Sequence, residues 1–169
     1  MAERDHVMEI REVTEREIKS KICDRILHKL PDWFGIESST AEYIGMVGEL
    51  PFYAAYADEN PVGFLAVKVH NPFTAEVCVM GVLGEYHRMG IGTALIERAV
   101  QFCRQEGMVY LTVKTLDGSV NFERTRRFYG KMGFIPLEVF PLLWDEANPC
   151  LFLAKHLACC PEKGGKMPG

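Results

Sequence analysis

Residues 77–83 form an unbroken run of apolar and β-branched side chains with one glycine, and the hydrophobic period changes directly after them. A continuous run of this length is typical of a strand that is covered on both faces of a sheet. From Ile91 the apolar residues recur at helical spacing, and Gly107 stands where a helix commonly ends. The stretch therefore predicts a buried strand, a short turn and an amphipathic helix.

The same patterns predict the other elements. Thr14 and Glu17 have the spacing of a capping box at the start of a helix that runs to about Leu30, and a second helix is expected from near Ser38. Further strands are predicted at residues 8–13, 52–57, 64–69, 109–114, 134–140 and 150–156, a further helix at 121–132, and an irregular excursion at 141–149.

This order of elements predicts an α/β fold with one mixed sheet. The strand at 77–83, the following helix and the strand at 109–114 form a βαβ unit, which requires parallel pairing. Short turns join most other strands and favour antiparallel pairing. We expect a mostly antiparallel sheet of six or seven strands with helices on both faces, in one domain over residues 1–160. The Gly- and Lys-rich residues 161–169 are expected to form a flexible tail.

Composition narrows the class of protein. The 169 residues are 48% hydrophobic and 25% charged, which is ordinary for a globular domain. A net charge of −4 disfavours nucleic acid as a partner and favours a cationic one. The sequence shows neither a membrane-spanning run nor a signal peptide. Six cysteines without a Cys-x-x-Cys pair indicate a reducing, cytoplasmic location and no metal site.

Gly90 and Gly92 open the predicted helix directly after the strand. A helix start carries unpaired N–H donors and the positive end of the helix dipole, so it suits a phosphate or pyrophosphate group. A Rossmann fingerprint would need a third glycine where this chain has Leu95, and the Gly-Lys-Ser/Thr of a P-loop is absent. The alternative use of the two glycines is close packing of the helix against the sheet.

With its flanks, this turn resembles the signature of the GNAT superfamily of acyl-CoA-dependent N-acetyltransferases. The family pattern is Gln/Arg-x-x-Gly-x-Gly/Ala after a strand that ends in apolar-x-Val, and here His87 occupies the Gln/Arg position. The resemblance implies that acetyl-CoA binds at this turn and at the end of the strand before it. The implied cofactor contacts are Met80, Gly81, Val82, His87, Arg88, Met89, Gly90, Ile91, Gly92 and Thr93.

Residues 126–134, Arg-Arg-Phe-Tyr-Gly-Lys-Met-Gly-Phe, resemble the second GNAT hallmark, a helix that ends in Phe/Leu-Tyr-x-Lys-x-Gly-Phe. In this family the Tyr at the position of Tyr129 faces the CoA sulfur, which implies that it protonates the leaving thiolate. Many members carry an Asn seven residues before this Tyr. Here Phe122 stands there, and Asn121 is the candidate for the cofactor contact. The alternative for Tyr129 is a ring packed in the core.

Glu76 is the candidate general base, because the segment from Glu76 to Val82 is similar to the histone-acetyltransferase pattern Glu-x-x-x-x-x-Val. Strand alternation would place Glu76, Cys78 and Met80 on one face, where a carboxylate among apolar neighbours is a better proton acceptor. An exposed Glu at the strand start, with deprotonation left to water, is the alternative. A ping-pong route through Cys78 is disfavoured because no activating cation stands nearby in the sequence.

The resemblance implies an enzyme that moves an acetyl group from acetyl-CoA to a primary amine by direct attack in a ternary complex. The expected acceptor is a small-molecule amine or a basic peptide, and the enzyme is expected to be a monomer or homodimer. Trp33, Phe34 and Tyr53 are candidates for the acceptor pocket, where aromatic rings could hold an ammonium group. A non-catalytic acyl-CoA sensor on the same fold and a nucleotide-binding protein are the alternatives.

Overall fold

Seven strands form one mixed sheet in the order β1-β2-β3-β4-β5-β7-β6 in the computed structural model, which describes residues 8–157. All neighbouring strands are antiparallel except β4 and β5. The strands are β1 Met8–Glu12, β2 Phe52–Ala57, β3 Asn60–Asn71, β4 Thr74–Val82, β5 Tyr110–Leu116, β6 Ile135–Asp145 and β7 Asn148–His156. The helices are α1 Arg16–Leu27, α2 Glu37–Met46, α3 Ile91–Gln105 and α4 Glu123–Lys131, with short 3-10 turns η1 Val47–Glu49 and η2 Gly84–Tyr86.

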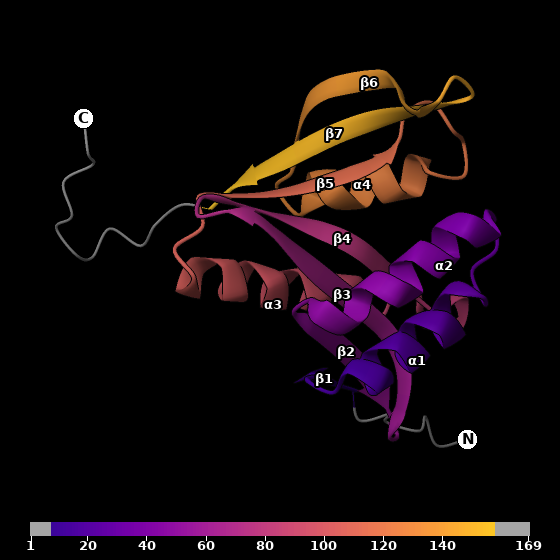
Figure 1. Ribbon diagram of the computed structural model, residues 1–169, viewed down its shortest axis with the longest axis vertical. Coiled ribbons are helices and arrows are strands. Elements are labelled where there is room, and N and C mark those ends of the chain that lie inside the picture. Colours follow the sequence, from indigo (N-terminus) through magenta and orange to yellow (C-terminus); the bar gives the residue numbers. More distant parts are fainter. Residues whose placement is uncertain (1–7, 158–169) are drawn as a thin grey trace, which may run out of the picture.

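The helices cover both faces of the sheet (Figure 1). On one face α1 packs so closely on β4 that a Cβ atom added to Gly81 would lie 3.1 Å from the Ile26 side chain. On the other face Tyr53 of β2 packs against Phe102 of α3. The predicted α/β fold, with helices on both faces and a parallel βαβ unit, is confirmed. Among residues 8–157, no helix has the length and apolar character needed to cross a membrane.

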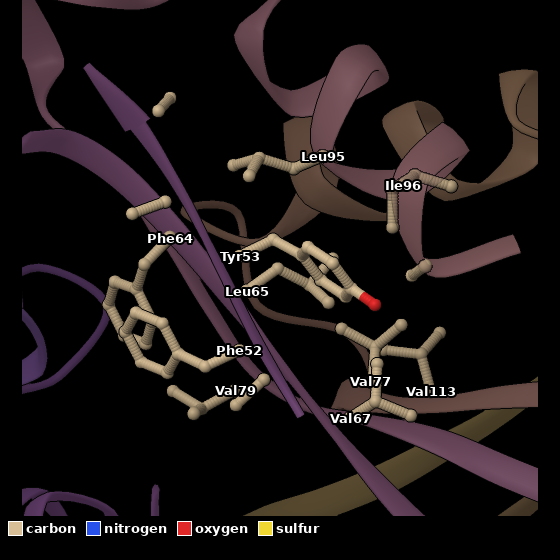
Figure 2. Close-up of a cluster of buried hydrophobic side chains, with 14 of the residues drawn as sticks. Phe52, Tyr53, Phe64, Leu65, Val67, Val77, Val79, Leu95, Ile96 and Val113 are labelled. Carbon is tan, nitrogen blue, oxygen red and sulfur yellow. The ribbon is translucent and has the colours of Figure 1, made fainter. Parts of the chain in front are cut away.

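Aromatic and branched side chains fill the core between the sheet and these helices. The rings of Phe52 and Phe64 stack with centroids 5.2 Å apart, and both are fully buried (Figure 2). Burial of one such ring is worth about 1.5–3 kcal/mol. The buried side of α3 repeats at helical spacing through Leu95, Ala99 and Cys103, as its sequence pattern predicted.

β4 and β5 pair over three residues and then separate. The parallel pairing covers Thr74 to Glu76 of β4, and Glu76 is the last residue with a partner on β5. Directly afterwards Val77 pairs with Val67 of β3 while Val79 pairs with the preceding Ala66, so Cys78 forms a bulge. A bulge bends and twists its strand, which carries β4 away from β5 (Figure 1). The main-chain groups along this opening are left without a neighbouring strand.

The bulge also corrects the prediction that Glu76, Cys78 and Met80 share one face. The Cys78 thiol lies 3.7 Å from Met46 of α2, whereas the Met80 methyl group lies against the start of α3, near Gly92. Figure 2 shows Val77 beside Val67, on the other side of the strand from Val79. One extra residue in β4 shifts the alternation of side chains by one position.

Two predicted boundaries also need correction. The capping box is wrong: Glu15 is the N-cap of α1 and makes no side-chain cap bond, because Val13 still pairs with Phe52 and the chain turns one residue later. The excursion at 141–149 is instead the tip of a long β6–β7 hairpin, in which Asp145 accepts hydrogen bonds from the residues of the turn. Proline is tolerated on an edge strand such as β6. The predicted tail at 161–169 lies outside the described residues.

β6 forms one edge of the described sheet. Its apolar side chains are mostly exposed, and the register with β7 shifts twice along its length. The exposed apolar residues of this edge are Ile135, Leu137, Val139, Leu142, Leu143 and Trp144.

Candidate active site

A cavity of about 760 Å³ lies where β4 and β5 separate. Its walls come from β4, β5, the start of α3, α4, the loop between α1 and α2, and the tip of the β6–β7 hairpin. The opening in the sheet therefore connects the α3 side of the molecule with the α1–α2 side. Ligands of α/β proteins commonly bind at such a break beyond the carboxyl ends of parallel strands.

The turn before α3 leaves its main-chain donors free. The amides of residues 88–93 donate no hydrogen bond to any part of the chain that the structure describes. Gly90, the N-cap of α3, has φ +78°, a left-handed conformation that glycine adopts without strain. Six free amides in the turn and at the start of a 15-residue helix are donors of the kind that suits an anion.

His87 gives this turn its shape. Its Nε2–H donates to the Val82 carbonyl at 2.7 Å, and its ring meets Trp33 edge-on at 5.8 Å. The residue that departs from the family pattern thus closes the turn on the end of β4 and connects it to the α1–α2 loop. The sequence placed His87 at the cofactor turn but gave no indication of this contact with Trp33.

Gly92 allows α3 to approach α4 closely. A Cβ atom added to Gly92 would lie 3.1 Å from the Phe128 ring and 3.3 Å from the Met80 methyl group. Both neighbouring residues line the cavity, so the space at Gly92 determines how the walls meet at this point.

Tyr129 lies in the cavity wall and is almost fully buried. Its ring is held between Phe128 and Phe134, each with its ring centroid 5.4 Å away. Its hydroxyl has no hydrogen-bond partner among residues 8–157. Burial raises the pKa of Tyr129 well above the ordinary value for a phenol. The side chain is therefore a neutral proton donor at any pH at which the protein would normally work.

Glu76 is buried at the point where the strands separate, but it does not line the cavity. Its Oε1 accepts a hydrogen bond from His70 Nε2 at 2.6 Å and lies 3.4 Å from Lys114 Nζ. The prediction that the Glu76 carboxylate has apolar neighbours is therefore wrong. The carboxylate instead contacts His70 of β3 and Lys114 of β5, because both strands still flank β4 at this position. Lys114 does line the cavity and connects Glu76 to it.

The other predicted residues divide between the cavity and its surroundings. Trp33 and Phe34 line the cavity, as do all the predicted residues of the cofactor turn except the exposed Met89. Asn121 lines a small neighbouring pocket together with Trp33. Tyr53 is not brought to the cavity: its ring is buried under α3, with the Arg98 guanidinium 5.2 Å from its centre.

Cys78 lines the cavity, but its environment does not activate it. Loss of hydration raises the pKa of the Cys78 thiol to about 11, and the nearby Glu76 carboxylate adds to the effect. At neutral pH the thiol is therefore protonated and a weak nucleophile.

His28 fixes the loop that forms the α1–α2 wall. Its ring contacts Asp24 Oδ1 at 2.6 Å and Glu37 Oε1 at 3.0 Å, which joins the end of α1 to the start of α2. The hydrogen bond with Glu37 is the main cause that raises the pKa of His28 to about 9. The bridge is therefore charged at neutral pH. The stability that this charged bridge adds to the fold is fully present below the unfolded-state pKa of histidine, near 6.5. It is lost as the pH rises through the folded-state pKa of about 9.

A sheet that opens at its parallel pair, beside a glycine-containing helix start with free amides, agrees with the site that the resemblance to acetyltransferases implied. The model of the Acetyltransferase (GNAT) family matches residues 16–134. The chain belongs to this family.

Relatives and solved structures agree with this assignment. An uncharacterized N-acetyltransferase of Chlorobaculum tepidum is 29% identical over 111 residues, and the match covers 64% of this chain and 64% of that relative's length. N-alpha-acetyltransferase 50 of Danio rerio is 29% identical over 128 residues, which cover 70% of this chain and 73% of that protein.

A GNAT-family structure from Desulfovibrio desulfuricans superposes with a TM-score of 0.80 at 18% identity, covering 90% of this chain and 100% of that one. An aminoglycoside 6'-N-acetyltransferase complexed with coenzyme A has a TM-score of 0.73 at 18% identity, covering 91% and 99%. At sequence identities this low, the similarity of the structures is evidence for a shared fold.

Proposed function

We propose that this protein transfers the acetyl group of acetyl-CoA to a primary amine by direct attack in a ternary complex. The observation that carries the proposal is one continuous cavity with free amides at the α3 start and the buried phenol of Tyr129 in its wall. A related structure that contains coenzyme A supports the choice of donor.

Two features of the opening fit the donor. The amides of residues 88–93 would hold the pyrophosphate, since they are free and lie at the positive end of the α3 dipole. Met80, Gly81 and Val82 pair with β3 on one side and have no strand partner on the β5 side, where their main chain would bind the amide groups of the pantetheine arm as a strand binds its neighbour.

The chemistry requires positioning and three proton transfers. The amine nitrogen attacks the thioester carbonyl carbon, the C–N bond forms, and the C–S bond breaks. Tyr129 gives its proton to the departing thiolate, and the proton that the nitrogen loses after the attack restores the Tyr129 hydroxyl. Before the attack, the ammonium must lose a proton, and for an alkyl amine with a pKa of about 10 this costs roughly 4 kcal/mol at pH 7.

Glu76 is the proposed acceptor of that proton, through water at the Lys114 side of the cavity. His70 contacts the same carboxylate oxygen and is partly exposed, so it offers a route for the proton to solvent. The proposal needs a bridging group because Glu76 itself is outside the cavity lining.

Glu76→Gln should therefore lower kcat/KM most near neutral pH. The deficit should shrink as the pH approaches the pKa of the amine, near 10, because the amine then arrives already neutral. The measurement is the ratio of wild-type to variant kcat/KM from pH 6 to 10 with one amine. A ratio that stays constant across this range would leave deprotonation to water.

A thiol-release assay with acetyl-CoA against polyamines, aminoglycosides, amino acids and peptides tests the proposed function. Release of one CoA thiol for each amide formed is the expected result. Tight binding of CoA without release for any amine would instead favour a non-catalytic acyl-CoA sensor.

A further inference from the structure

The half of the cavity next to α1 and α2 is built mainly from large apolar groups. We refer to it as the acceptor chamber, because the α3 start would hold the donor; Trp33 lies between the two, with its ring 5.8 Å from the His87 ring. Its walls include Trp33, Phe34 and Tyr43 from the α1–α2 side and Leu143 and Trp144 from the β6–β7 hairpin. The rings of Phe34 and Tyr43 meet at 90° with centroids 6.3 Å apart. Such walls match a compact apolar or aromatic body.

The charges in the lining are the reverse of those in the whole chain. The chain has a net charge of −4, yet Asp145 is the single carboxylate among the described residues that line the cavity. Both Asp145 oxygens already accept hydrogen bonds from Asn148 Nδ2, and one also accepts from the Ala147 amide. These donors are neutral, so the Asp145 carboxylate holds the hairpin turn and keeps its negative charge as the one acidic group of the described lining.

Lys114 is one of the cationic side chains in the described lining, with Arg88 and Arg124, and it is the one that contacts Glu76. Its side chain is one-third exposed, and its Nζ lies 3.4 Å from Glu76 Oε1. An ammonium group has three N–H donors, so contact with Glu76 leaves donors for a ligand. Glu76 is also bound by His70 at the shorter distance of 2.6 Å, so its carboxylate keeps a hydrogen-bond donor when Lys114 turns to a ligand.

We propose that the acceptor is a primary amine that carries an apolar or aromatic body and a carboxylate, as in an apolar α-amino acid, and that Lys114 binds this carboxylate. The inference rests on the proposed acetyl transfer and names its acceptor class. A polyamine or aminoglycoside would bring several cations into a cavity whose described lining has one carboxylate and already carries Arg88, Lys114 and Arg124, and desolvation of unpaired charges is unfavourable.

The test compares L-phenylalanine with 2-phenylethylamine, which share the ring and the amine and differ in the carboxylate. Wild-type kcat/KM should be about fivefold or more higher for L-phenylalanine, the size of a partly exposed ion pair. Lys114→Met should bring the ratio of kcat/KM for the two amines close to one, chiefly by raising the KM for L-phenylalanine. The matched control is Lys21→Met, because Lys21 is exposed on α1 and outside the cavity.

Calorimetric binding of the same amines to CoA-saturated protein separates the two proposals. A binding preference for L-phenylalanine that depends on Lys114, without thiol release, would support the acceptor class and overturn acetyl transfer. Thiol release that is fastest with spermidine or an aminoglycoside would support acetyl transfer and overturn the acceptor class. If Lys114→Met leaves the ratio of kcat/KM for the two amines unchanged, the proposed acceptor class is also overturned.

Discussion

Tyr129→Phe should lower kcat about 100-fold and leave the affinity for CoA nearly unchanged, because it removes a proton donor and keeps the ring. The ring of residue 129 packs between Phe128 and Phe134, so removal of the hydroxyl group should leave the cavity wall unchanged. Because burial raises the pKa of Tyr129, the phenol should stay protonated over pH 6 to 9. The deficit of the variant should therefore be constant across this range.

The measurements are kcat over this pH range and the Kd of CoA by calorimetry. Tyr110→Phe is the control, since Tyr110 is exposed at the start of β5 and outside the cavity lining. Wild-type turnover in Tyr129→Phe, under conditions where the chemical step limits the rate, would remove the donor role.

Gly92→Leu should weaken CoA binding at least tenfold, or by about 1.4 kcal/mol. The new Cβ would lie 3.1 Å from the Phe128 ring and 3.3 Å from Met80, so α3 and α4 must move apart or the side chains must turn into the cavity. Either change displaces the free amides of the α3 start from their ligand.

Calorimetry with CoA measures this effect, and circular dichroism should show that the variant is folded. Gly45→Leu on α2 is a matched control, because a Cβ there meets no atom within 4 Å. If Gly92→Leu bound CoA as tightly as the wild type, the close approach at Gly92 would not be required for the cofactor.

The sequence predicted the parts of the site that depend on local order. The strand, the two glycines and the α3 start are contiguous, and their hydrophobic periods identify them without knowledge of the rest of the fold. The Tyr129 helix ends at a glycine for the same kind of local reason, with Gly133 at φ +90°. The antiparallel pairing of the early strands and the parallel β4–β5 pair followed from turn lengths and the helix between β4 and β5, whereas the position of β7 between β5 and β6 was not predicted.

The remaining features depend on contacts between distant residues. The bulge at Cys78 arises from the register of β4 against β3, and no local signal in residues 76–80 indicates it. The partners of Glu76 come from β3 and β5. Trp144 lines the cavity because the tip of the β6–β7 hairpin forms part of its wall, whereas Tyr53 packs against Phe102 of α3. Side-chain type alone could not separate these two aromatic residues.

The exposed edge strand β6 has a consequence for how molecules of this protein behave at high concentration. Six large apolar side chains along a sheet edge would normally invite another chain to add a strand. Pro136 and Pro141 lack an N–H, Glu138 adds a charge, and the register against β7 breaks near both prolines. An incoming strand would meet an irregular ladder of hydrogen bonds. Replacement of these prolines would regularise the edge and turn a tolerated apolar surface into a nucleus for aggregation.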